Sequence, residues 1–161
     1  MTHEAQCRRC GVSCHVAVPL GARVVVVPDL HCRFLLQPSP GTFACAVYAE
    51  RFRAAPWCHH ADVAGPLGYL AVDCPHGRAE VGKVRVSEAE FAKLWPEIWR
   101  ILRGWGVPAF IDQAAFLAMV ARRTGRAWEL VPWSVPADGD QPFAAETQQM
   151  RLRAATTSPQ A

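Results

Sequence analysis

Three cysteines and a histidine fall within nine positions near the start of the chain, in the stretch CRRCGVSCH at residues 7 to 15. Thiolates are soft ligands that suit zinc, copper(I) and iron–sulfur centres. Cys7 and Cys10 have the Cys-x-x-Cys spacing that lets two sulfurs reach one ion from a single tight loop. Gly11 gives that loop backbone freedom, and Cys14 follows shortly after. The stretch therefore predicts a metal-binding loop.

The remaining cysteines extend this pattern through the first half of the chain only. Residues 75 to 161 contain none, and five of the six histidines lie within two positions of a cysteine. An odd number of cysteines without a secretory leader argues against a disulfide framework and for metal binding in a reducing compartment. The candidate ligands are Cys7, Cys10, Cys14, Cys32, Cys45 and Cys58, with Cys74 and His15 in reserve.

Other interpretations remain open for some of these residues. Cys45 and Cys74 stand in apolar surroundings and also fit small buried side chains. A redox Cys-x-x-Cys would need a helix directly after the motif, and GVSCHVAVPLG is a poor helix. Among nearby carboxylates, Asp73 beside Cys74 is the best candidate to accept a hydrogen bond from a metal-bound imidazole.

Composition limits the classes of partner. The formal net charge is only +3 and the basic residues are scattered, which argues against a nucleic-acid partner. No apolar run approaches the roughly 20 residues that span a bilayer, and the first residues lack the apolar core of a signal peptide. The expectation is a cytoplasmic protein that binds a metal ion, with a protein or peptide as a further candidate partner.

The first half of the chain predicts loops and short strands. A hairpin around the turn PSPG at 38–41 would bring Cys32 near Cys45. The β-branched run at 22–30 predicts a strand that Pro28 stops. The other predicted segments are a loop at 7–20, hairpin strands at 32–36 and 42–48, a helical turn at 49–55, and a loop with one short strand over 58–86.

The second half predicts two helices and a strand. Ser87 and Glu90 form a capping-box signature before a helix that Pro96 should kink or split. Its Trp95 and Trp99 share one face and are expected to pack on the core. The second helix is expected over 108–124, with Pro108 near its start, Arg122 and Arg123 at its end and Gly125 as its C-cap, and a strand over 128–135.

These elements predict a small cysteine-rich α+β fold of loops and short antiparallel strands with two packed helices. Residues 1–86 form the metal-binding region, residues 87–136 complete the same domain, and residues 137–161 are expected to be a polar, flexible tail.

The order of four motifs resembles a known family. CRRCGVSCH, HCRFLL, ACAVYAER and PWCHH are similar to the YkgJ-type cysteine-cluster proteins, a family described as zinc- or iron-chelating, and the match covers about residues 7 to 76. The resemblance implies zinc or iron as the cofactor, held as a mononuclear site or as an iron–sulfur cluster.

Three positions depart from the family pattern. Where the family doubles its cysteine, this chain has Ser13 and Cys14 or, shifted by one residue, Cys14 and His15. The family's Arg-Pro is Arg51-Phe52 here, and Cys58 comes later than the pattern expects. His15 would still suit zinc or iron, whereas Ser13 would not.

The sequence leaves three functions open. The first is metal chelation by the thiolates. The second is a metalloenzyme, dependent on iron or an iron–sulfur cluster, that modifies a peptide or a small molecule. The third is an interaction module stabilised by zinc. No phosphate-binding loop, dinucleotide fingerprint, His-Glu-x-x-His or nucleophile-elbow motif supports another class of enzyme.

Overall fold

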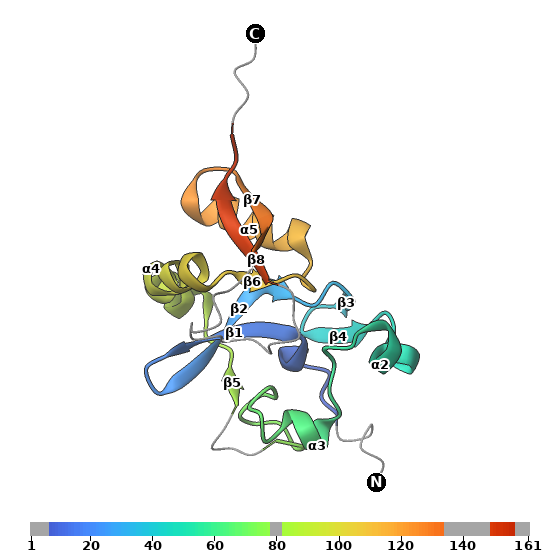
Figure 1. The fold of residues 1–161 in the computed structure, drawn as a ribbon. Helices are drawn as coiled ribbons and strands as arrows, with labels where there is room; N and C mark the ends of the chain where they lie inside the picture. The colour runs from blue at the N-terminus through green and yellow to red at the C-terminus, as the bar shows by residue number, and fades with distance from the viewer. Residues whose placement is uncertain (1–6, 78–81, 134–148, 157–161) are drawn as a thin grey trace.

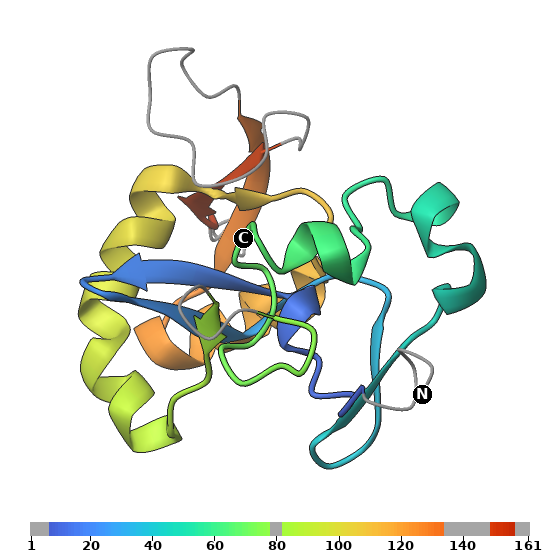
Figure 2. The same cartoon turned by 90° about the horizontal axis from the view of Figure 1, so that it is seen from below.

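The computed structural model describes residues 7–77, 82–133 and 149–156. Short strands and helices are interleaved in it, which confirms the predicted small α+β fold. Helix α4 lies on one side of the central hairpin, and the cysteine-bearing hairpin β3–β4 lies on the other side (Figures 1 and 2).

A hairpin of two apolar strands forms the centre of the molecule. β1 (His15–Leu20) pairs antiparallel with β2 (Arg23–His31), and the short β5 (Lys83–Val84) pairs parallel with β2. Gly21 makes the tight turn between β1 and β2 with a φ of 61°. Val27 packs in the main core, whereas Val26 joins a smaller cluster that includes Val12. The consecutive valines are therefore buried on both faces of the hairpin.

Two predictions for this region are wrong. The expected loop over 7–20 contains a 3₁₀ turn, η1 (Val12–Cys14), followed by β1. β2 also continues past Pro28 to His31. Pro28 is tolerated because the pairing register shifts between Ala17↔Val26 and His15↔His31, so Pro28 lies where the ladder is irregular.

Helix α4 (Glu88–Trp105) begins where the sequence predicts. The Ser87 hydroxyl accepts a hydrogen bond from the Glu90 backbone N–H at 3.2 Å. The helix continues through Pro96 without a break, because residues on both sides of it, including Phe91 and Ile98, are buried in one core. None of the described helices combines the length and apolar character needed to cross a membrane.

Helix α5 (Gln113–Thr124) starts later than predicted. Pro108 belongs instead to the short strand β6 (Val107–Pro108), and the Asp112 carboxylate caps the helix by accepting from the Ala115 N–H at 3.0 Å. The C-terminal end agrees with the prediction, because Gly125 takes a left-handed conformation with a φ of 71°.

A third sheet closes the fold. β8 (Gln149–Ala154) lies between β6 and β7 (Trp128–Trp133) and pairs antiparallel with both. The predicted flexible tail is therefore wrong for 149–154, where Met150 and Leu152 are buried in alternation with exposed arginines. Residues 137–148 and 157–161 of the predicted tail lie outside the described residues.

The main core joins α4, α5, the central hairpin and the third sheet. Its fully buried members include Phe91, Ile98, Leu102 and Phe116. Trp95 and Trp99 pack against this core with their ring centroids 5.4 Å apart, as predicted. The cysteines lie outside this core, on the side of the hairpin β3–β4.

Candidate metal centre

The hairpin of β3 (Leu35–Ser39) and β4 (Thr42–Cys45) forms where the sequence predicts one, but its strands differ from the predicted 32–36 and 42–48, so Cys45 lies in the hairpin and Cys32 precedes it. Leu35 pairs with Cys45 across the ladder, and the Leu35 N–H donates to the Cys32 carbonyl at 3.0 Å. A tight turn therefore leads from Cys32 to the residue that faces Cys45, at the open end of the hairpin.

The turn η1 brings Cys14 to the same place. The Cys32 N–H donates to the Cys14 carbonyl at 2.8 Å, so the two backbones are in direct contact. Gly11 precedes the turn with a φ of 70°, and a Cβ there would lie 2.6 Å from Cγ of Phe43. Only glycine allows the loop to approach the hairpin this closely.

Cys58 reaches the group from the segment after helix α2 (Arg51–Ala54), which follows the 3₁₀ turn η2 (Tyr48–Glu50), a region where the sequence predicted a helical turn. The adjacent Trp57 ring stacks between Phe34 and Phe110, with centroids 6.1 Å and 5.0 Å away. This stack fixes the Cys58 segment between the hairpin β3–β4 and the main core.

Electrostatics shows that these four side chains share one environment. We call Cys14, Cys32, Cys45 and Cys58 the four-thiol group. The pKa of the Cys14 thiol is raised to about 11, mainly by burial and also by repulsion from thiolates at Cys32, Cys58 and Cys45. Burial also raises the pKa of Cys58; the charge of Arg51 opposes this shift, and thiolates at Cys45 and Cys32 add to it. Deprotonation of the group therefore needs a compensating positive charge.

The remaining cysteines have other neighbours. Cys10 and Cys74 both pack against the cluster of Val12, Val26 and Ala71, and Cys7 is exposed. Arg8 donates to the Asp73 carboxylate and, at 2.7 Å, to the Asp73 carbonyl. Asp73 thus contacts the first loop through an arginine, and its role in accepting a hydrogen bond from a metal-bound imidazole stays a prediction.

His15 is buried beside the four-thiol group. Its Nδ1 lies 2.8 Å from the Gly11 carbonyl, which can only accept, so Nδ1 carries the proton and Nε2 keeps its lone pair. Burial lowers the pKa of His15 to about 4, and the charges of Arg85 and Lys83 add to the shift. The ring is therefore neutral at pH 7, the state in which imidazole binds metals.

His31 and Lys83 belong to this region although sequence reasoning did not select them. The His31 ring centroid lies 5.3 Å from that of His15, and its position next to Cys32 in the sequence was the available signal. Lys83 is buried and its Nζ donates to the His15 carbonyl at 2.5 Å. Nothing in the sequence marks Lys83, because a lysine in a two-residue strand is ordinarily exposed.

The types of the four side chains suit a metal ion, but their present arrangement does not hold one. Four thiols match the ligand set of a closed tetrahedral zinc or iron site. Within residues 7–77, 82–133 and 149–156, however, no three Cys, His, Asp or Glu side chains are arranged to hold a metal ion as they stand. All cysteines described are free thiols. The sulfurs would have to draw together on binding.

No protein-family model, curated protein or solved structure matches this chain. The resemblance to the YkgJ-type proteins therefore remains a prediction from the motifs. What is established is the class of molecule, a small α+β protein with a group of free thiols at one edge of its central hairpin.

Proposed function

We propose that this chain chelates a zinc or iron ion through the thiolates of Cys14, Cys32, Cys45 and Cys58. The observation that carries the proposal is the convergence of four sequence-distant cysteines in one partly buried environment, where neighbouring thiolates raise the pKa of Cys14 and of Cys58. A divalent cation removes this repulsion, because it offsets the negative charge that burial and proximity make costly.

Four thiolates fill a tetrahedral coordination shell and leave no open position for a substrate. This donor set favours binding, storage or structural stabilisation over catalysis. His15 is the reserve ligand, since its free Nε2 lone pair would suit a site in which one thiolate is replaced. An iron–sulfur cluster remains compatible with the same four cysteines.

Metal content tests the proposal directly. Protein purified without oxygen should contain about one metal ion or cluster per chain, as expected for one four-thiolate site. The variants Cys32→Ser and Cys58→Ser should lose it, whereas the matched variant Cys7→Ser, at an exposed position outside the four-thiol group, should retain it. A brown protein with broad visible absorbance would identify iron–sulfur, and a colourless one zinc. Full metal content in Cys32→Ser, or none in the unmodified protein, would refute the proposal.

A further inference from the structure

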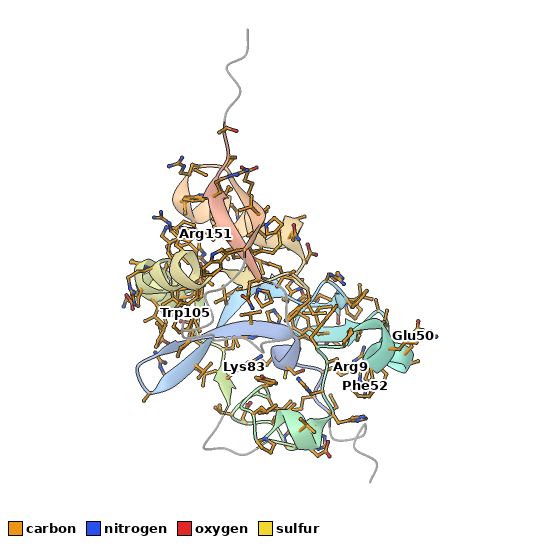
Figure 3. All side chains as sticks on the ribbon, viewed as in Figure 1. Arg9, Glu50, Phe52, Lys83, Trp105 and Arg151 are labelled. Carbon is orange, nitrogen blue, oxygen red and sulfur yellow. The ribbon has the colours of Figure 1, made fainter. Side chains whose placement is uncertain are left out.

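Lys83 is a buried cation beside the four-thiol group. It is the first residue of β5 and is only 9% exposed (Figure 3). Its Nζ donates to the carbonyl of His15, the residue after Cys14, and lies 5.7 Å from the ring centroid of Tyr69. These contacts hold the ammonium against the backbone that carries Cys14.

The ammonium has no carboxylate partner in the part of the chain that the structure describes. Every ion pair found there has an arginine as its cation. A buried charge is costly unless an opposite charge compensates it. Burial accordingly lowers the pKa of Lys83 to about 8, and the negative charge that opposes this effect is a Cys14 thiolate.

A second cation lies close by. Arg85 donates to the Cys10 carbonyl at 3.2 Å, and its guanidinium lies 5.4 Å from the ring centroid of Phe43. Arg85 is exposed and its charge can be solvated, so it does not need an internal partner. Lys83 does need one.

We propose that Lys83 is the internal counter-ion of an anionic thiolate centre. Four thiolates around a divalent cation leave a net charge of about −2, and a buried ammonium offsets part of it. This inference rests on the proposed function and specifies it further. A site with two thiolates and two neutral imidazoles would be uncharged and would leave Lys83 uncompensated, so a buried ammonium favours a ligand set with at least three thiolates.

The test replaces the charge and keeps the shape. In Lys83→Met, zinc binding measured by competition with a chromophoric chelator should weaken by roughly 10- to 100-fold, the effect of removing one nearby charge in a partly buried site. Lys83→Arg keeps the charge and should stay within about threefold of the unmodified protein. The matched control is Lys93→Met. Lys93 is the only other lysine of the chain and is exposed on α4, so this variant should leave the zinc affinity unchanged.

Denaturant unfolding of the metal-free protein separates this role from a structural one. Without metal, Lys83→Met removes a buried charge and should be at least as stable as the unmodified protein, while the zinc-loaded variant should be less stable than its unmodified counterpart. Unchanged zinc affinity in Lys83→Met would overturn the counter-ion role alone. So would a variant that is equally destabilised with and without zinc, or that does not fold. Absence of zinc binding in the unmodified protein would overturn both proposals.

Discussion

At the scale of single residues, the cysteines differ sharply in their surroundings. Cys7 is exposed, Cys32 is buried against Ile111 across an isolated bridge, and Cys14 is partly buried beside other thiols. The nucleophile in thiol chemistry is the thiolate, so accessibility and pKa together decide how fast each cysteine reacts. The metal-free protein should therefore show a wide spread of thiol reactivities.

We expect Cys14 to be alkylated at least tenfold more slowly than Cys7 in the metal-free protein near neutral pH. Burial raises the pKa of Cys14 from 9.0 to about 11, and each pKa unit lowers the thiolate fraction about tenfold. Timed labelling with iodoacetamide, followed by peptide mass spectrometry, measures both rates in one sample. Equal rates for the two cysteines would contradict the described environment of Cys14.

At the scale of elements, the junction between α4 and β6 depends on one glycine. Gly106 ends the helix with a φ of 75°, and a Cβ there would lie 2.4 Å from the Met150 carbonyl oxygen and 3.1 Å from Cε3 of Trp133. Helix α4 and the third sheet can approach each other only because this side chain is absent.

Gly106→Ala should lower the free energy of unfolding by about 2 kcal/mol or more, because the backbone conformation and the contact with Met150 both oppose a side chain. The matched control is Gly104→Ala, in the last turn of α4, where a Cβ would meet nothing within 4 Å. That variant should gain about 0.5–1 kcal/mol from helix propensity. Urea denaturation compares both with the unmodified protein, and a Gly106→Ala variant of normal stability would contradict the junction.

The elements also show what a single sequence can predict. Ser87, Gly125 and the PSPG turn act locally, through capping and backbone preference, and the start of α4, the end of α5 and the presence of the hairpin β3–β4 were predicted correctly. β1 and β8 were missed because a strand's stability comes from its partners, which a local pattern does not reveal. For the candidate site, a hairpin was predicted correctly, but the residue that faces Cys45 across it is Leu35 and not Cys32. The contacts of Cys10 and the burial of Lys83 are tertiary and had no local signal.

At the scale of the whole molecule, the four-thiol group and the main core are stabilised differently. The core of α4, α5 and the third sheet is closed by large apolar side chains. The segments that carry Cys45 and Cys58 contain short elements and exposed apolar residues such as Phe52 and Val63. Little apolar burial stabilises that half, so a bound ion would contribute much of its stability.

Removing the metal should therefore destabilise the segments that carry Cys45 and Cys58 and leave the main core stable. After chelation, amide hydrogen exchange should increase over residues 32–77, while the amides of α4 and α5 remain protected. Exchange measured by mass spectrometry, with and without zinc, tests this difference. Cysteine variants that cannot bind metal serve as controls and should match the chelated protein. Equal loss of protection in α4 would mean that the metal supports the whole fold.

The position of Trp57 makes it an intrinsic fluorescent probe of metal binding at Cys58. The chain has six tryptophans. Five lie at or beyond position 95, and only Trp57 is adjacent to a cysteine of the four-thiol group. Because its indole is clamped between Phe34 and Phe110, any shift of the neighbouring sulfur must change the ring's surroundings. If the other five tryptophans are replaced by phenylalanine, the fluorescence emission of Trp57 would report metal binding in real time, without an added dye.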